Sequence, residues 1–258
     1  MTSALLPVKF DKGQGSVVVL LHGLGSSAES WDYTLELCDY TQNRVITLDL
    51  LGFGDAPKPS ECKYTFDDHA NAVIATLDNL GCKLVMIVGH SMGSIVAIEI
   101  ARKRPDLVNG LVLCGTPLYK KEPRDNWLAR MTRSGGLYFK IFRGVRDSPD
   151  AMKAGSDVAN KLTGLMKGVE ITDQTWPAYR GSLEHTIMQF DTYRHAFDID
   201  TPMLFLDGVF DVFIIHKNNH TIVRKNANAK HKTIFGSHEL SSRHSKAIAR
   251  IINVNSLG

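Results

Sequence analysis

The sequence predicts an α/β protein with a mostly parallel central sheet and helices on both faces. Three observations support this fold class. Short runs of branched apolar residues alternate along the chain with segments of helical periodicity. One of these runs, residues 85–88, leads through Gly89-x-Ser91-x-Gly93 directly into a helical pattern. The alternation stops near residue 118 and resumes near residue 202, which indicates an insertion into the sheet domain.

Composition places the chain among ordinary globular proteins. Its 258 residues suit one large α/β domain with an insertion, and 43% of them are hydrophobic. The net charge of +3 gives no sign of nucleic-acid binding, and no apolar stretch reaches the length of a membrane span. No signal peptide is recognisable, so we expect a cytoplasmic protein with neither a nucleic acid nor a membrane as partner. The oligomeric state is not predicted.

The first half of the chain reads as alternating strands and helices. Apolar runs mark the strands, and helix 67–80 carries Val73, Leu77 and Leu80 on one face and ends at Gly81. We expect these elements in order: strand 5–10, strand 17–21, helix 28–38, strand 43–50, helix 67–80, strand 85–88, helix 94–103 and strand 107–114.

The second half begins with helical periodicity and returns to the sheet afterwards. We expect a helical insertion over residues 119–196, followed by strand 202–207, helix 218–226, strand 232–235 and a final helix over 241–252. The predicted domains are therefore a core of residues 1–118 and 197–258 and an inserted domain of residues 119–196.

The Gly-x-Ser-x-Gly pentapeptide places a serine at the tip of a sharp strand-to-helix turn. A Cβ atom at Gly89 or Gly93 would crowd the crossing of the strand and the helix, and glycine removes it. Ser91 would then lie at a helix N-terminus, where backbone N–H groups favour a developing anion. This context makes Ser91 the candidate nucleophile, which needs a base to take its proton.

His238 is the best-placed base in the sequence. It follows the strand expected at 232–235 and precedes the last helix, at the sheet edge that also holds Ser91. Four other histidines are weighed as alternatives. His231 would precede that strand, at the opposite edge, and His244 falls within the last helix. For these two, and for His216 and His220, a solvated surface position is the preferred interpretation.

Five segments, in their order and spacing, resemble the α/β-hydrolase superfamily. They are His22-Gly23, residues 49–54, the pentapeptide around Ser91, residues 208–211 and a late histidine. The resemblance covers nearly the whole chain. It implies the α/β-hydrolase fold, a helical cap inserted over the active site, and membership of the capped, esterase-like serine-hydrolase branch.

The resemblance also implies a catalytic triad in the chain order serine, acid, histidine. An acid just beyond strand 202–207 would share a sheet edge with Ser91, which leaves Asp207 and Asp211 as candidates. The family pattern Gly-x-x-Asp matches residues 208–211 and favours Asp211. The chain departs from the family at Ser237, because relatives commonly carry glycine before the catalytic histidine.

An oxyanion hole is implied by the same resemblance. Its two donors would be the backbone N–H groups of Met92, directly after the nucleophile, and of Leu24, after His22-Gly23. His22 would hold the oxyanion loop by hydrogen bonds or border the substrate pocket. His90, next to the nucleophile, would line or support that pocket.

The insertion supplies the candidate lining of an acyl pocket. Trp127 and Phe139 are singled out among its apolar residues, although packing on the core is the simpler role for each. Residues 120–170 contain eleven Lys or Arg and six Asp or Glu. This excess indicates either a solvated basic face or attraction of acidic substrates. The scattered cysteines lack metal-ligand spacing, and no phosphate loop is present, so no metal or cofactor is expected.

The expected activity is hydrolysis of a small-molecule ester or thioester through an acyl-enzyme intermediate. A serine nucleophile separates the chain from members of the fold that attack with aspartate. A carbon–carbon bond hydrolase remains an alternative, although such enzymes usually place Trp just after the catalytic histidine, where this chain has Glu239. A second alternative is a ligand receptor of the same fold with very slow turnover.

Overall fold

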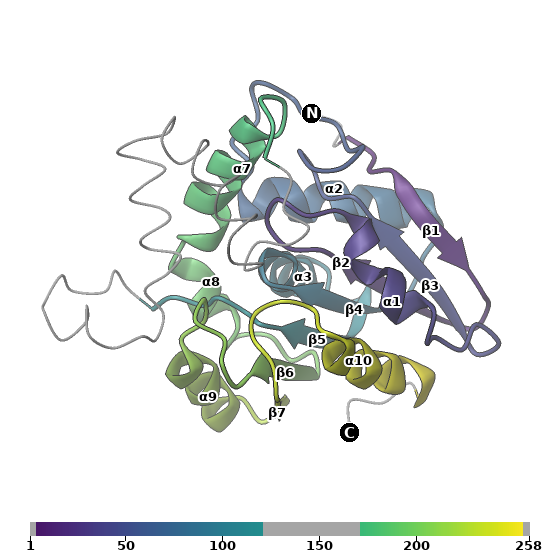
Figure 1. Ribbon diagram of the computed structural model, residues 1–258, viewed down its shortest axis with the longest axis vertical. Coiled ribbons are helices and arrows are strands. Elements are labelled where there is room, and N and C mark those ends of the chain that lie inside the picture. Colours follow the sequence, from purple (N-terminus) through teal and green to yellow (C-terminus); the bar gives the residue numbers. More distant parts are fainter. Residues whose placement is uncertain (1–3, 121–170, 255–258) are drawn as a thin grey trace, which may run out of the picture.

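The core of the protein is a seven-stranded sheet with strand order β1-β3-β2-β4-β5-β6-β7 (Figure 1). The computed structural model describes residues 4–120 and 171–254. All neighbouring strands are parallel except β1, which pairs antiparallel with β3. The expected mostly parallel sheet is thereby confirmed. The strands are β1 Val8–Lys12, β2 Ser16–Leu21, β3 Asn43–Leu48, β4 Val85–His90, β5 Val108–Cys114, β6 Met203–Gly208 and β7 Ala229–Ile234.

Helices cover both faces of this sheet, as the sequence predicts (Figure 1). Among the described residues, none of them is long and apolar enough to cross a membrane. The main helices are α2 Phe66–Asn79, α3 Met92–Lys103, α9 His216–Lys225 and α10 Ser242–Val254. Shorter ones are η1 Ala28–Trp31, α1 Asp32–Leu35, α7 Trp176–Ser182, η2 Leu183–Ile187 and α8 Asp191–His195.

Two apolar layers hold the helices on the sheet. Side chains alternate along a strand, so β2 contributes Val19 and Leu21 to the layer beneath α2 and α3, and Val18 and Leu20 to the opposite layer. The second layer receives Trp31 from η1 and residues of α1 and α10. Because both faces of β2 are fully buried, its sequence is a continuous apolar run, which is why it could be recognised as a central strand.

The topology brings several loops to one edge of the sheet. The chain passes from β2 to β3 on one side and then returns to β4 on the other, so the strand order reverses between β2 and β4. In open α/β sheets, ligands bind at the carboxyl ends of strands near such a reversal. The loops after β2, β4, β5, β6 and β7 all meet at this edge.

Three elements differ from the sequence prediction. Strand β1 begins at Val8, three residues later than the expected strand 5–10. The helix expected at 28–38 is one turn of 3₁₀ helix, η1, followed by the single α-helical turn α1, which ends at Leu35. Strand β7 begins at Ala229, three residues earlier than expected, so His231 lies within the strand. This strand forms the edge of the sheet, and its sequence AKHKTI is polar and partly exposed. Edge strands often carry lysine, which weakens the apolar pattern that marks a strand.

Most of the predicted insertion lies outside the described residues, so its boundaries at 119 and 196 remain a prediction. The described part, residues 171–196, contains α7, η2 and α8 and is helical as expected. It is fixed to the core by buried polar contacts. Thr186 Oγ1 donates a hydrogen bond to the carbonyl of Tyr64 at 2.9 Å, and Ser182 Oγ lies 2.9 Å from His69 Nε2.

Candidate active site

Ser91 occupies a strained turn between β4 and α3. Its backbone angles are φ 52° and ψ −116°, and among the described residues Tyr64 is the only other non-glycine residue with positive φ. Such a conformation costs about 1–3 kcal/mol and persists only where its surroundings enforce it. Here the Ser91 N–H donates to the carbonyl of Cys114 at the end of β5, at 2.8 Å. The turn is thus tied to the neighbouring strand.

The two glycines of the pentapeptide are required by close backbone contacts. A Cβ atom on Gly89 would lie 2.5 Å from the carbonyl carbon of Gly93, and one on Gly93 would lie 2.3 Å from the carbonyl oxygen of Leu21. Real Cβ atoms do not approach backbone that closely. The expectation that a Cβ at either position would crowd the crossing is confirmed.

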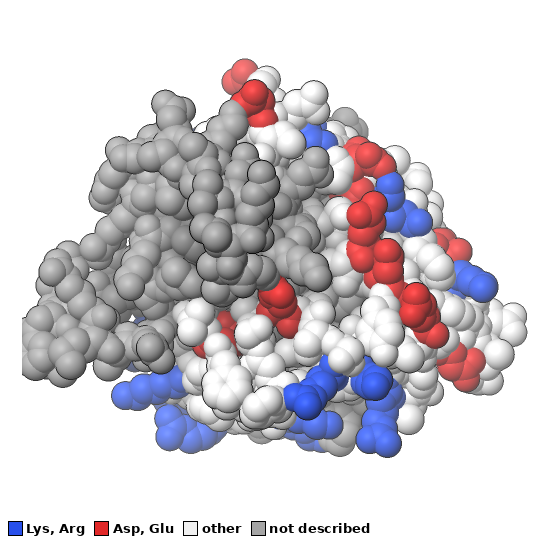
Figure 2. All heavy atoms as spheres, in the orientation of Figure 1, with Lys and Arg blue, Asp and Glu red and all other residues white. Residues whose placement is uncertain are grey.

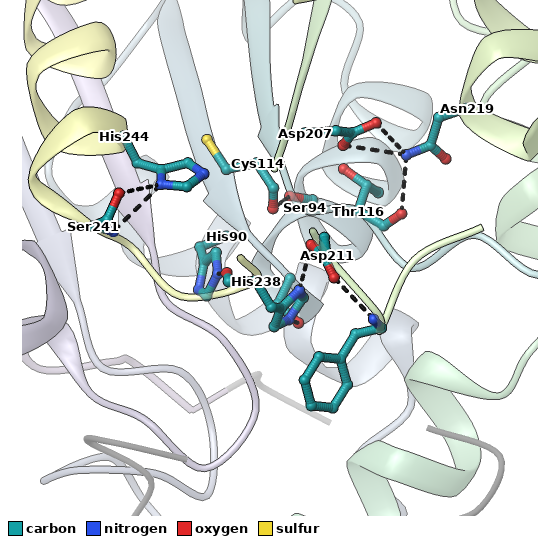
Figure 3. Close-up of polar contacts among 12 residues, drawn as sticks. His90, Ser94, Cys114, Thr116, Asp207, Asp211, Asn219, His238, Ser241 and His244 are labelled. Atoms are coloured by element: carbon teal, nitrogen blue, oxygen red, sulfur yellow. Dashed lines mark hydrogen bonds and ion pairs between the residues drawn. The ribbon is translucent and has the colours of Figure 1, made fainter. Parts of the chain in front are cut away.

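Three side chains from separate loops form a continuous chain of hydrogen bonds. His238 Nε2 lies 2.9 Å from Ser91 Oγ, and His238 Nδ1 lies 2.7 Å from Asp211 Oδ2. Figure 3 shows the imidazole of His238 with its hydrogen bond to the Asp211 carboxylate. The geometry fits a ring that donates its Nδ1–H to the carboxylate and accepts the serine proton at Nε2. The structure therefore brings together the serine, acid and base that the resemblance implies.

The Asp211 carboxylate is held in its charged form. Burial raises the pKa of this carboxyl, but the neighbouring His238 and hydrogen bonds from His238 and the Phe213 N–H lower it, and the net pKa lies below its usual range. The Phe213 N–H donates to Asp211 Oδ1 at 2.9 Å. Both carboxylate oxygens are therefore engaged, which fixes the orientation of the acid.

Further contacts fix the position of His238, and sequence reasoning missed three of the residues that make them. The ring of Phe213 lies 4.6 Å from the His238 ring, and the carbonyl of Phe213 accepts a hydrogen bond from Tyr119 Oη at 2.8 Å. Gly115 lies directly beneath the pair, because its Cβ would be 3.0 Å from Asp211 Oδ2 and 3.2 Å from His238 Nδ1. In the sequence, the only sign of this close contact is that a glycine directly follows strand 107–114.

The two rejected candidates, Asp207 and His231, pair with each other (Figure 3 shows Asp207). His231 Nε2 lies 3.0 Å from Asp207 Oδ2, and Asn219 of α9 donates to the same carboxylate oxygen at 3.1 Å. Asn219 also donates to the carbonyl of Thr116. This buried cluster connects β6, β7, α9 and the loop after β5, and it serves the architecture.

The three remaining candidates for the base, His216, His220 and His244, lie in helices. His244 is buried in α10, and its Nδ1 accepts a hydrogen bond from Ser241 Oγ at 2.8 Å, as Figure 3 shows. His216 is the first residue of α9, and His220 lies within that helix.

The loop after β2, where the oxyanion donors are expected, lies beside the nucleophile. A Cβ on Gly23 would be 3.3 Å from Ser91 Cβ, which places the backbone leading to Leu24 next to the serine. Met92 is the first residue of α3, so its N–H is among the groups that lack a partner within the helix. The assignment of these two N–H groups as oxyanion donors remains a proposal.

His22 and His90 act as connectors between backbone segments. His22 is fully buried; its Nδ1–H donates to the carbonyl of Gly23 at 2.8 Å and its Nε2 accepts from the Leu50 N–H at 2.9 Å. Both ring nitrogens are therefore occupied by backbone groups, one in the loop after β2 and one in the loop after β3. His90 is partly buried, and its Nε2–H donates to the carbonyl of His238 at 2.8 Å. Burial lowers the pKa of His22 to about 4 and that of His90 to about 3.

The pocket residues of the insertion and the absence of a metal or cofactor are two expectations that the described residues do not test. Trp127 and Phe139, the candidate pocket residues of the insertion, lie outside the described residues. Within the ranges 4–120 and 171–254, no group of three or more His, Cys, Asp or Glu side chains is placed to hold a metal ion. That the protein uses no metal or cofactor stays a prediction.

Comparison with known proteins shows which family this chain resembles. The family model described as the alpha/beta hydrolase fold matches residues 16–201. One similar protein is a "Probable lysophospholipase BODYGUARD 2" from Arabidopsis thaliana, 36% identical over 108 residues, which are 40% of this chain and 23% of that protein. Another is a "2-hydroxymuconate semialdehyde hydrolase" from Pseudomonas sp. (strain CF600), 32% identical over 41% of this chain and 38% of that protein. The matches thus span well under half of these relatives.

Solved structures show the same fold over nearly the whole chain. The enol-lactonase from Burkholderia xenovorans LB400 superposes with a TM-score of 0.74, covers 96% of this chain and 94% of its own, and is 17% identical in sequence. At this identity the likeness concerns the fold alone.

The glycine contacts predict that Gly93→Ala destabilises the protein. The new Cβ would meet the Leu21 carbonyl oxygen, so strand or helix must shift, at a cost of about 1–3 kcal/mol. Urea unfolding followed by circular dichroism measures this loss. Gly81→Ala is the control, since Gly81 also lies near a helix end but faces open space. A loss at Gly93 that is no larger than the modest backbone penalty at Gly81 contradicts the close-contact interpretation.

The burial of His22 predicts a loss of stability in acid. Its folded-state pKa of about 4 lies below the value near 6.5 of an unfolded histidine, so the stabilisation is complete above pH 6.5 and declines as the pH falls toward 4. Between pH 7.5 and pH 5 this residue alone should lower the free energy of unfolding by about 2 kcal/mol.

Denaturant unfolding of the wild type and His22→Gln at both pH values checks this. The variant is expected to be less stable at pH 7.5 but to lose about 2 kcal/mol less than the wild type on acidification. Equal losses in the two proteins would show that His22 does not titrate on unfolding.

Proposed function

This chain belongs to the alpha/beta hydrolase fold family, and from that premise we propose that it is a serine hydrolase that cleaves carboxylic ester or thioester bonds of small molecules. The observation that carries the proposal is the continuous hydrogen-bonded chain from Ser91 Oγ through His238 to Asp211. A serine at a strained turn, with an oriented base within hydrogen-bond distance, has the arrangement of an activated nucleophile.

The first step forms an acyl-enzyme. Ser91 Oγ attacks the carbonyl carbon while His238 Nε2, 2.9 Å away, takes the hydroxyl proton. The Asp211 carboxylate stabilises the imidazolium that results and keeps Nε2 directed at the serine. The negative charge that develops on the carbonyl oxygen would be bound by the backbone N–H groups of Met92 and Leu24. Each such donor typically contributes a factor of about 10²–10³ in kcat.

The second step releases the acid. The imidazolium of His238 gives its proton to the departing alcohol or thiol, and the carbon–oxygen or carbon–sulfur bond breaks. A water molecule then attacks the acyl-enzyme with His238 again as base, which regenerates the Ser91 hydroxyl and frees the carboxylic acid. Apart from water and the substrate, these steps use only side chains and backbone N–H groups of the chain.

The similar proteins suggest two kinds of scissile bond. Similarity to a probable lysophospholipase supports ester cleavage, whereas similarity to 2-hydroxymuconate semialdehyde hydrolase keeps carbon–carbon cleavage as a second candidate. Carbon–carbon hydrolases of this fold usually place Trp after the catalytic histidine, and here Glu239 follows His238. This departure favours the ester hypothesis. A receptor with the same triad would be distinguished by turnover close to zero.

The first test is hydrolysis of p-nitrophenyl esters from acetate to decanoate. The wild type should turn over repeatedly, and Ser91→Ala should lose up to about 10⁶ in kcat because the triad acts as a unit. Ser94→Ala is the matched control: Ser94 lies in the first turn of α3, and its Oγ donates to the backbone carbonyls of Gly89 and Cys114 and not to the groups that transfer the proton. It should retain most of the turnover.

Activity that survives intact in Ser91→Ala would overturn the mechanism. A wild type without turnover above the variant, but with activity on a vinylogous diketone, would favour carbon–carbon cleavage instead. Inactivity on both substrates combined with tight ligand binding would favour the receptor hypothesis.

The two neighbouring acids give a second test. Asp211→Asn should lower kcat by about 10⁴, because the amide cannot hold the Nδ1–H tautomer of His238. Asp207→Asn should reduce stability by weakening the contact with His231, with most of the turnover kept. Kinetics and denaturant unfolding of both variants separate these effects. A larger loss of kcat in Asp207→Asn than in Asp211→Asn would reverse the assignment of the acid.

A further inference from the structure

Three large apolar side chains are exposed on the two loops that carry the acid and the base. Val209 and Phe210 follow β6 and are 47% and 58% exposed, and Phe235 follows β7 and is 63% exposed. The rings of Phe210 and Phe235 pack edge to face with centroids 5.2 Å apart. We call these three residues the apolar patch. Exposed apolar side chains that gather in this way mark interaction sites.

The backbone beneath the apolar patch is ordered by hydrogen bonds between the loops. The Val209 N–H donates to the carbonyl of Ile234 at 2.9 Å, and the Phe210 N–H donates to the carbonyl of Gly236 at 3.0 Å. The side chains of the apolar patch therefore extend from an ordered backbone. Binding there would not need to order the loops first, which lowers its entropic cost.

The part of the chain that follows Asp211 and includes Phe235 is rich in positive charge. Residues 212–254 contain eight Lys or Arg and one acidic residue, Glu239, whereas the described residues before them contain 12 Lys or Arg and 20 Asp or Glu. Figure 2 shows basic side chains gathered along the lower side, over α9 and α10, and acidic ones on the upper right. The basic residues of this region are Lys217, Arg224, Lys225, Lys230, Lys232, Arg243, Lys246 and Arg250.

Arg243 joins the charge to the patch directly. Its guanidinium carbon lies 5.0 Å from the centroid of the Phe235 ring, and its Nη1 donates to the Phe235 carbonyl at 3.2 Å. This contact is exposed, so the remaining guanidinium donors stay available to an anion.

From these features we propose that the apolar patch and its basic surroundings form a docking site for an anionic lipid surface. The side chains of Val209, Phe210 and Phe235 enter the interfacial layer, where aromatic and aliphatic anchors are stabilised. Arg243 and the lysines around the patch bind anionic headgroups. The site is a peripheral contact, and it is compatible with the absence of a spanning helix among the described residues.

Two other occupants fit less well. A second copy of the chain, paired through edge strand β7 about a two-fold axis, would bring Lys230 and Lys232 of one copy close to the same lysines of the other, and like charges across such a contact repel. A single-stranded nucleic acid would need open ring faces for stacking. The Phe235 ring is instead occupied by Arg243 and by the edge contact with Phe210.

Docking here would place the reacting groups at the lipid surface. Phe210 directly precedes Asp211, and Phe235 lies three residues before His238. The proposal goes beyond the proposed hydrolysis and is tested by binding alone, so either can fail without the other. It also departs from the expectation that no membrane is a partner, which rested on the lack of an apolar stretch long enough to span one.

The test is co-sedimentation of the purified full chain with phosphatidylcholine vesicles, prepared with and without phosphatidylserine. We expect binding to the vesicles that contain phosphatidylserine and little to the others. Binding should weaken as the salt concentration is raised, because salt screens exposed charges over a Debye length of about 10 Å at 0.1 M.

Variants separate the apolar from the electrostatic contribution. The double variant Phe210→Ser/Phe235→Ser should lower the partition coefficient about tenfold or more, since two aromatic anchors are lost. Lys232→Gln and Lys246→Gln should each lower it about fivefold. The matched controls are Leu84→Ser and Lys83→Gln, exposed residues just before β4 at the opposite edge of the sheet, and both should bind like the wild type.

Several outcomes would overturn the proposal. They are equal binding to both kinds of vesicle, no binding to either, and undiminished binding of the double variant when its unfolding curve shows it to be folded. Concentration-dependent dimerisation that the double variant abolishes would assign the patch to a second copy. Tight, patch-dependent binding of a single-stranded oligonucleotide, without binding to vesicles, would assign it to nucleic acid.

Discussion

The backbone of Ser91 is the constraint on which the site depends. Its positive φ would relax unless the strand before it and the helix after it were fixed relative to each other. Their close crossing at Gly89 and Gly93 and the hydrogen bond from Ser91 to Cys114 prevent this. Helix α3 is buried from its first residue through Ala101, so apolar burial over three turns supports a conformation that costs only a few kcal/mol. The core therefore stabilises the turn that presents the nucleophile.

Histidine has three different roles within this small region, and its surroundings determine which. His22 is enclosed, bound to backbone at both nitrogens and kept neutral, and it links the loop after β2 to the loop after β3. His90 is also kept neutral and holds the backbone of His238 through its single N–H. His238 alone lies between a hydroxyl and a carboxylate, where each nitrogen meets a group that can exchange or share a proton. Two neutral rings thus orient the loops around the one ring that is placed for proton transfer.

The fold could be predicted because its signals are local or periodic, and the family resemblance indicated the three side chains, Ser91, Asp211 and His238, that the structure brings together. Apolar runs marked the buried strands, and the glycine spacing around Ser91 reported a backbone contact directly. The pairing of Asp207 with His231 could not be predicted, because β7 is a polar edge strand and no apolar pattern marks its first three residues, which include His231. Gly115 and Phe213 escaped notice for a related reason. Both residues contact His238, which is distant in the sequence, and a local sequence pattern cannot indicate such contacts.

The net charge of the whole chain hides an uneven distribution, because it is a sum over all residues. A net charge of +3 over 258 residues suggests a protein indifferent to charged surfaces, yet the described residues before 212 are acidic in balance and those after it are strongly basic. Exposed charges are screened over a Debye length of about 10 Å at 0.1 M salt, so a partner senses the local charge of the protein surface and not the net charge of the whole chain. The basic segment also supplies β7, α10 and the loop of His238. The loops that bring Asp211 and His238 together are therefore the same ones that expose Phe210 and Phe235, so a partner docked there, as proposed, would lie beside the hydrogen-bonded chain that leads to Ser91.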